Sequence, residues 1–436
     1  MIIIFIIRYY LIQKGKSHGS LYYIAAFFSG MYRHRLLLKR NIGLIAIAMA
    51  LILGRLGGIS DSDIINGFNS NLFMILLGVS YLFAIARSNG TLEAVARKTI
   101  GLAGRHINLI PVIMVVAGAL LAMAGPGTIP VLALMVMLST ALAKELGLDP
   151  LSFTVCCFMG AAGGGMSPIA PTGIVALELA AEEGYTGIGI PYMFTVLLAF
   201  LLFAIIYYFA TGLFKAKALS APLSLKEVPP LTRQQWITIA GIVIMILLVL
   251  IFGINVGLAS FLIAAILNIM GMCDERQILK EINWGTLVMI CGTGVLMNVI
   301  IELGGIDKLS SALASIMTPY TAPSLMSLSS GTMGFFASTS GVVIPTMVPA
   351  VPGIVETLGG GVTPLSLISA LSIGSQIAGI SPASTGGALA LAAFVTMYKP
   401  NAEEKNRYFI RLFITAILGV LFMSALGLTG FYTWLH

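Results

Sequence analysis

The chain repeats a set of Gly, Pro and Ser residues at one constant spacing of 214 positions. The matched pairs are Pro150 and Pro364, Gly160 and Gly374, Gly165 and Gly379, Ser167 and Ser381, Pro168 and Pro382, and Gly173 and Gly387. A single offset shared by all of them indicates an internal duplication. Because glycine and proline interrupt helices, each copy is predicted to contain a helix broken at the same place.

The composition places these copies in a membrane. Hydrophobic residues make up 58% of the chain and charged residues only 9%, whereas soluble domains carry roughly 25% charged residues. Residues 106–143, 184–214, 234–273 and 309–355 contain no Asp, Glu, Lys or Arg. Each stretch exceeds the ~20 apolar residues that cross a bilayer. We therefore expect an all-α polytopic membrane protein, and we exclude a large soluble enzyme with buried helices.

About nine membrane spans are expected, two of them broken. They cover residues 42–58, 71–88, 150–182, 189–214, 235–253, 256–272, 284–302, 364–397 and 407–432. Two further apolar stretches, between Arg105 and Lys144 and between Lys308 and Glu356, carry a central Gly/Ser/Thr-rich break. We interpret them as two re-entrant hairpins that enter and leave on one side. Reading each hairpin as two true spans leaves the parity of the layout unchanged.

Loop charge sets the expected orientation. With a cytoplasmic N-terminus, every Lys and Arg except Arg55 and Lys308 lies on the inner side of this layout, as the positive-inside rule predicts. The C-terminus is then extracytoplasmic, and the protein belongs in the plasma or inner membrane. The net charge of +7 reflects this orientation, so it does not indicate a nucleic-acid partner.

The layout divides the chain into four parts. Residues 41–214 form the first copy and residues 255–436 the second, each with four spans and one hairpin. Residues 215–254 are a linker and one connecting span, and that odd span inverts the second copy relative to the first. Residues 1–40 form a basic leader outside the repeat. We expect Met31 to be the native start, with residues 1–30 not native.

The candidate site consists of the two hairpin tips and the two breaks. Unwound backbone at membrane depth is tolerated only where it lines a cavity or is buried in protein. Its carbonyl and hydroxyl oxygens suit a small hard cation, and the N-terminus of the half-helix that follows suits an anion. Close helix packing is the alternative explanation for such small residues. The candidate residues are Gly125, Gly127, Thr128, Gly163, Gly164, Gly165, Ser167 and Thr172 in the first copy, and Ser338, Thr339, Ser340, Gly379, Ser381, Ser384 and Thr385 in the second.

Ionisable residues are absent from these four sequence segments. Proton-coupled pumps and cation antiporters usually carry buried carboxylates or histidines, so the pattern favours an anion transported together with a cation. Two Na⁺ positions are expected, one near Thr128, Gly165 and Ser167 and one near Ser340, Gly379 and Ser381. No other cofactor is expected, and no catalytic acid, base or metal set is found, so we do not expect an enzyme.

A hairpin tip followed by a Gly-rich broken span, present in both copies, resembles the ion transporter superfamily, which includes the divalent anion:sodium symporters. Residues 41–44, 77–83, 89–92 and 167–173 more closely resemble the malonate carrier (MatC-type) family, over about residues 31–436. The resemblance implies a homodimer, scaffold and transport domains, elevator-type movement, and uptake of small carboxylates. Sodium–dicarboxylate symporters carry Ser-Asn-Thr at both tips, whereas this chain has Gly125-Pro-Gly-Thr128 and Ser338-Thr-Ser340.

These observations predict a secondary active transporter of small organic anions, C3–C4 dicarboxylates such as malonate, coupled to Na⁺ or H⁺. Its partners are the anion, the coupling cation and the lipid bilayer. An efflux protein or a cation/proton antiporter of the same superfamily is the alternative among transporters. From other classes, a channel and a non-transporting membrane scaffold stay open.

Overall fold

The structure is a computed structural model that describes residues 41–101, 107–215, 230–282, 284–335, 337–359 and 361–434. Every regular element within these ranges is a helix and none is a strand, which confirms the all-helical prediction. The leader at 1–40, with the Met31 start, lies outside the described residues. So does 216–229 of the predicted linker.

The helices of the first copy, in chain order, are α3 (Ile42–Gly57), α4 (Asp61–Asn66), α5 (Ser70–Ser88), α6 (Thr91–Gly101), α7 (Ile110–Met123), α8 (Thr128–Leu146), α9 (Pro150–Gly164), α10 (Pro171–Glu182) and α11 (Gly189–Ala210). The connecting span is α12 (Arg233–Phe252). The second copy comprises α13 (Val256–Ile269), α14 (Glu275–Glu281), α15 (Trp284–Glu302), α16 (Gly305–Ala314), α17 (Ala322–Gly334), the π-helix η3 (Thr339–Val343), α18 (Ile344–Met347), α19 (Val351–Thr357), α20 (Pro364–Ala378), α21 (Thr385–Tyr398) and α22 (Ala402–Leu428).

Several of these helices can cross a bilayer. In the described part of the chain, six helical segments are long and apolar enough: 61–88, 128–146, 189–210, 284–302, 339–357 and 402–428. Two of them, 128–146 and 339–357, are the second arms of the expected hairpins. Shorter apolar helices, among them α3, α9, α13, α20 and α21, lie within other expected spans, and the expected number of spans stays a prediction.

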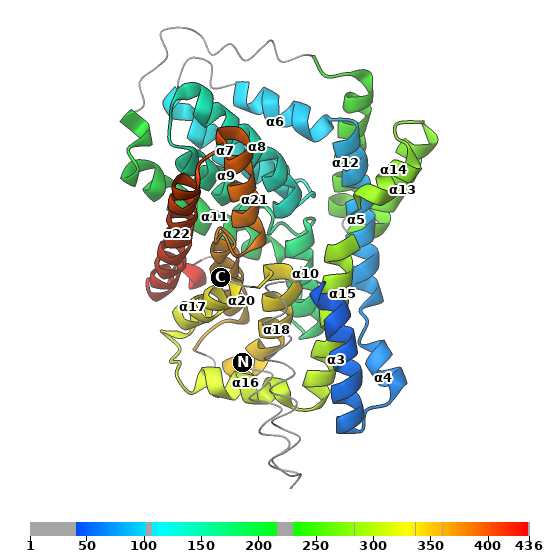
Figure 1. The fold of residues 1–436 in the computed structure, drawn as a ribbon. Coiled ribbons are helices and arrows are strands. Elements are labelled where there is room, and N and C mark those ends of the chain that lie inside the picture. The colour runs from blue at the N-terminus through cyan, green and yellow to red at the C-terminus, as the bar shows by residue number, and fades with distance from the viewer. Residues whose placement is uncertain are drawn as a thin grey trace.

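The helices form two groups that lie side by side (Figure 1). The first group consists of α3, α4, α5, α12, α13, α14 and α15, and the second of α7, α8, α9, α11, α17, α20, α21 and α22. Helix α6 links α5 to α7 on one side, and α16 follows α15 on the opposite side (Figure 1). Helices α10 and α18 lie between the two groups, so the groups meet around the segments that the sequence singled out.

Both copies build their broken span in the same way. The side chains of Asp149 and Thr363 cap α9 and α20 by accepting a hydrogen bond from the N–H of Ser152 and of Ser366, and a proline follows each cap. Capping oxygens and a first-turn proline favour helix initiation. Helix α9 then ends at Gly164 and α20 at Ala378, and α10 and α21 begin at Pro171 and Thr385. Each span is therefore two half-helices joined by six residues.

The first break differs from its prediction. We expected unwound backbone from Gly163 onward, but α9 continues through Gly164 and the break covers residues 165–170. A Cβ on Gly164 would lie 2.2 Å from the carbonyl oxygen of Ala119, and one on Gly163 would lie 3.1 Å from the Cβ of Phe200. These two glycines therefore allow close packing of α9 against α7 and α11, as small residues do in membrane proteins.

The first group is held together by two equivalent helix crossings. Helix α3 packs on α15, and α13, the second-copy counterpart of α3, packs on α5. A Cβ on Gly292 would lie 2.4 Å from the carbonyl oxygen of Gly43, and one on Gly78 would lie 2.3 Å from that of Gly257. Gly43 matches Gly257, and Gly78 matches Gly292, at the offset of 214. Each crossing thus joins one helix of residues 41–214 to one helix of residues 255–436.

We expect Gly292→Ala to lower the thermal stability of the purified protein in detergent. Its Cβ would meet the Gly43 carbonyl, and overpacking of this kind costs about 1–3 kcal/mol. The matched control is Gly294→Ala in the same helix, whose Cβ would lie 3.8 Å from its nearest neighbour, the Gly67 oxygen. Both substitutions replace glycine by alanine within one helix, so they change the intrinsic helix propensity by the same amount. Equal unfolding temperatures for the two variants would contradict close packing at this crossing.

Candidate functional site

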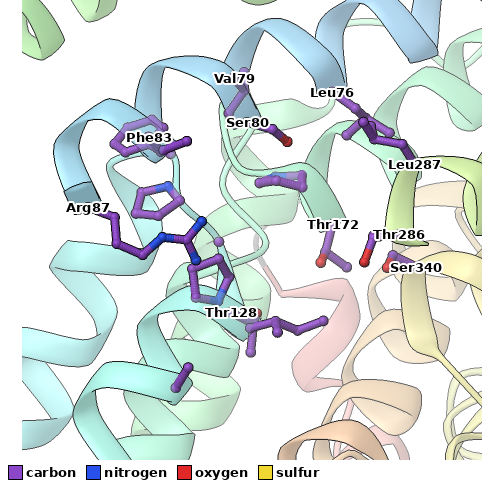
Figure 2. Close-up of a pocket in the computed structure, with 18 of the residues that line it drawn as sticks. Leu76, Val79, Ser80, Phe83, Arg87, Thr128, Thr172, Thr286, Leu287 and Ser340 are labelled. Atoms are coloured by element: carbon purple, nitrogen blue, oxygen red, sulfur yellow. The ribbon is translucent and has the colours of Figure 1, made fainter. Parts of the chain in front are cut away.

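A cavity of about 200 Å³ lies between the two helix groups. Helix α5 contributes residues from Leu76 to Arg87, and α14 and α15 contribute Glu281, Thr286, Leu287 and Ile290. From the other side come the first hairpin tip, residues 125–130, and Thr385 of α21. In Figure 2, Thr172, Thr286 and Ser340 gather on one side of this cavity, while Arg87 extends toward it from the end of α5.

A smaller cavity of about 40 Å³ adjoins the first. The two cavities share Thr128, Ile129, Thr172, Ser340 and Thr385 as lining residues. The smaller one is also lined by further residues from the second tip and the second broken span, namely Ser338, Thr339, Gln376, Gly379, Ser384 and Gly386. The structure therefore brings both tips and both broken spans to one place, which we call the central site.

Three helices begin at the central site. Thr128 is the first residue of α8, Thr172 the second residue of α10, and Thr385 the first residue of α21. None of these helices has a side-chain cap on its first turn. The first N–H groups of a helix have no partner within the helix and carry its positive dipole end. Three such ends facing one cavity make a region suited to negative charge.

The first tip depends on glycine. Gly125 and Gly127 have φ angles of 131° and 77°, in the region that residues with a Cβ rarely adopt. A Cβ on Gly165 in the first break would lie 2.0 Å from the Thr128 Oγ1. Glycine at these positions thus lets the tip approach the break closely.

The hydroxyl groups at the site divide into two sets. Ser338 Oγ accepts a hydrogen bond from the N–H of Gly341, and Thr339 Oγ1 donates to the carbonyl oxygen of Ser375, so both hold the second tip in place. Within the described residues, the hydroxyls of Ser340, Thr172 and Thr385 have no hydrogen-bond partner, and all three residues line both cavities. The second set is available to a ligand.

Three predicted residues, Gly165, Ser167 and Ser381, lie in the breaks but line neither cavity. Ser167 and Ser381 are buried, and each hydroxyl accepts a hydrogen bond from the N–H two residues on, that of Ile169 and of Ala383. They shape the turns through which the chain passes between half-helices. Their hydroxyl oxygens keep a second lone pair, which a cation held within the break could use.

Sequence reasoning missed three side chains. Gln376 of α20 lines the smaller cavity, and its Nε2 donates to Thr128 Oγ1 at 2.8 Å. Arg87 and Glu281 line the larger cavity and form an ion pair, with Arg87 Nε 3.4 Å from a Glu281 carboxylate oxygen. Gln376 carried a usable signal, because it is an amide in a half-helix of otherwise small and apolar residues. Arg87 and Glu281 sit at span ends, where charge is ordinary.

The described residues contain no cluster of three or more His, Cys, Asp or Glu side chains that could hold a metal ion. The oxygen atoms within the two breaks are backbone carbonyls and hydroxyls, which suit hard cations with oxygen ligands. Helices α9 and α20 end at the two breaks. A helix C-terminus presents unpaired carbonyl groups and a negative dipole end, so a monovalent cation fits the break regions.

We expect Gly165→Ala to reduce transport at least tenfold. The new Cβ would collide with Thr128 Oγ1 and lie 2.9 Å from the Thr128 backbone nitrogen, so the first tip must move. Misplacement of about 1 Å at a binding site commonly costs on the order of a hundredfold in rate. Initial uptake rates in proteoliposomes measure the effect, with Gly294→Ala as the control. Wild-type uptake by a folded Gly165→Ala protein would show that the first tip has no role.

Comparison with known proteins supports a transporter. A family model described as "Citrate transporter" (CitMHS) matches residues 31–374. No curated protein sequence matches the chain.

Two solved structures share its fold. The Alcanivorax borkumensis YdaH transporter aligns with a TM-score of 0.62 at 13% identity, over 91% of this chain and 99% of that chain. Neisseria gonorrhoeae MtrF, from a class of antimetabolite efflux pumps, aligns with a TM-score of 0.54 at 14% identity, over 90% of this chain and 94% of that chain. At such identities the likeness establishes the fold alone.

The family and the fold agree with the apolar helices. The prediction of a membrane transporter rather than an enzyme is confirmed, while the narrower malonate carrier assignment stays a prediction. The chain is a membrane protein of the CitMHS citrate transporter family.

Proposed function

We propose that this chain is a secondary active transporter of small organic anions, C3–C4 dicarboxylates such as malonate, driven by a coupling cation. The observation that carries the proposal is the convergence on one cavity of the N-termini of α8, α10 and α21, none of which has a side-chain cap. Free N–H groups and positive dipole ends bind carboxylates without a fixed positive charge. This arrangement is also typical of secondary transporters with broken helices.

The size of the cavity supports a small substrate. Pockets for drug-sized ligands occupy roughly 300–1,000 Å³, whereas the larger cavity here measures about 200 Å³. A molecule of a few carbon atoms fits such a volume. The hydroxyls of Ser340, Thr172 and Thr385, with the helix N-termini, would then hold its carboxylates from several directions.

The break regions support cation coupling, by Na⁺ or by H⁺. One Na⁺ would bind near Thr128, Gly165 and Ser167, and the other near Ser340, Gly379 and Ser381. In the part of the chain that the structure describes, the only carboxylate lining either cavity belongs to Glu281, which pairs with Arg87. A proton-coupled mechanism would usually employ a buried carboxylate or histidine, so this arrangement favours Na⁺.

The two helix groups support elevator-type movement. The central site lies at their boundary, and α6 and α16 lead from one group to the other (Figure 1). Sliding of the second group along the first would carry the site across the bilayer.

We further propose that the first group supplies the contacts of a homodimer. The copies would be inverted in the membrane, with a cytoplasmic N-terminus and an extracytoplasmic C-terminus.

Thermal unfolding of the purified protein with and without ligand tests the substrate class. A ligand at 100 times its Kd stabilises the folded state by about 2.7 kcal/mol. We expect malonate to raise the unfolding temperature, and malonamide, its neutral diamide, to leave it unchanged. If malonate raises the unfolding temperature more in Na⁺ than in choline, the result would favour Na⁺ coupling. Equal stabilisation by malonate and malonamide would contradict an anion site.

A further inference from the structure

The central site is not symmetric, although the repeat would allow it to be. Gln376 is 6% exposed, lines the smaller cavity and donates to Thr128 of the opposite copy. At the offset of 214, Gln376 matches Ala162, and Thr128 matches Val342. The polar pair on one side therefore corresponds to an apolar pair on the other.

The Gln376 amide retains unused hydrogen-bonding capacity. A carboxamide offers two N–H donors and one carbonyl acceptor. Among the described residues its single partner is Thr128, at 2.8 Å from Nε2. The second N–H and the carbonyl oxygen are left to whatever occupies the cavity, and burying them without a partner would be unfavourable.

Thr128 fixes the position of this amide. Its hydroxyl accepts from Gln376 and donates to the carbonyl oxygen of Ala161 in α9 at 3.2 Å. The chain of hydrogen bonds thus runs from α20 of the second copy, through the first tip, to α9 of the first copy. Glycine at position 165 leaves room for this hydroxyl, because a Cβ there would collide with it.

We propose that Gln376 is a substrate-binding residue, whose free N–H donates to a carboxylate oxygen of the transported anion. The proposal rests on the proposed function. It implies that the substrate binds off the pseudo-two-fold axis, with one carboxylate at the Gln376–Thr128 pair and the other toward Ser340 and Thr385. An anion with two carboxylates a few bonds apart matches this arrangement better than a monocarboxylate does.

Two substitutions test the proposal in proteoliposomes containing the full chain. Gln376→Leu removes the donor, and we expect the KM for malonate to rise at least tenfold. Gln376→Glu has nearly the same shape, but an ionised carboxylate repels the anion. We expect it to be inactive at pH 7.5 and to regain uptake, relative to the wild type, as acidification protonates it.

The pH response separates binding from a structural role. None of the described residues that line the smaller cavity has an ionisable side chain, and Arg87 and Glu281 of the larger cavity stay the same in every variant. If uptake by Gln376→Glu rises relative to the wild type as the pH is lowered, that rise therefore comes from protonation of the introduced carboxyl group. Ser369→Ala is the matched control, because Ser369 is a buried residue of α20 that lines neither cavity and whose hydroxyl has no hydrogen-bond partner among the described residues.

The outcomes discriminate clearly. A KM for Gln376→Leu within twofold of the wild type, or a Gln376→Glu pH profile that parallels the wild type, would overturn the proposal. If Gln376→Leu does not fold, Gln376→Glu decides alone. Failure of the wild type itself to transport any carboxylate would overturn the proposed function and this inference together, whereas wild-type uptake with unaltered Gln376 variants would overturn the inference only.

Discussion

Thr385→Asp should abolish uptake of organic anions while leaving the protein folded. Thr385 is exposed, lines both cavities and is the first residue of α21. A carboxylate in the first turn of a helix stabilises it by about 0.3–1 kcal/mol. The same carboxylate would repel a bound anion. At ~4 Å and an effective dielectric constant of about 20, that repulsion amounts to about 4 kcal/mol, or nearly a thousandfold in affinity.

The measurement is the initial rate of malonate uptake, together with the unfolding temperature of the same preparation. Thr385→Asn is the matched control, since it has the shape of aspartate without the charge, and we expect it to retain much of the activity. An unfolding temperature equal to or above that of the wild type, with uptake below about one-hundredth, would match repulsion of the anion by the new carboxylate. Uptake by Thr385→Asp within twofold of the wild type would place the anion elsewhere.

A covalent link between α5 and α10 should stop transport reversibly. Asn71 Nδ2 of α5 donates to a carboxylate oxygen of Glu178 in α10 at 2.9 Å. Helix α5 belongs to the first group, whereas α10 continues the broken span that begins with α9 of the second group. If the groups slide past each other, this contact must break in every cycle. The double variant Asn71→Cys/Glu178→Cys, crosslinked with a bis-methanethiosulfonate reagent whose spacer replaces the length of the two longer side chains, should therefore be inactive, and reductant should restore uptake.

The control link joins two positions within the second group. Arg411 of α22 makes two hydrogen bonds, of 2.8 and 2.9 Å, to the carboxylate of Asp149 at the start of α9. Asp149→Cys/Arg411→Cys crosslinked with the same reagent should transport at the rate of its reduced form, because the linked elements move together. Native Cys156, Cys157 and Cys291 are buried, whereas Cys273 is partly exposed, so both double variants also carry Cys273→Ser. Full activity of the crosslinked 71–178 variant would exclude sliding at this boundary.

Much of the fold could be predicted from the sequence because its main determinants are local. Uncharged stretches longer than a bilayer is thick predict spans, and paired Gly and Pro residues predict breaks. The matched caps at Asp149 and Thr363 begin equivalent helices, and the crossings at Gly43 and Gly292 and at Gly78 and Gly257 follow from the repeat. A constant offset is informative since it needs no knowledge of tertiary packing.

The central site was less predictable. Thr128, Thr172, Ser340, Ser384 and Thr385 were found because helix-breaking segments mark them, and all five line a cavity. Such marks do not distinguish a residue that faces the cavity from one that shapes a turn, as Ser167 and Ser381 do.

Residues that act through long-range contacts leave no local signal. Gln376 lies 248 positions from its partner Thr128, and only the packing of α20 beside the first tip joins them. Gly163 and Gly164 show the converse error. A run of three glycines predicts an unwound segment. Gly163 and Gly164 nevertheless lie in α9, where they pack closely against α11 and α7.

The most direct test of the account is uptake of radiolabelled malonate, succinate and citrate into proteoliposomes, under an inward Na⁺ gradient and, separately, under a pH gradient. We predict accumulation of a dicarboxylate against its own gradient when Na⁺ is supplied outside, and its loss in Thr385→Asp. Accumulation driven only by pH would retain the anion site and assign the coupling to protons. No accumulation of any of the three anions under either gradient would contradict the central claim that the converging helix N-termini form a carboxylate transport site.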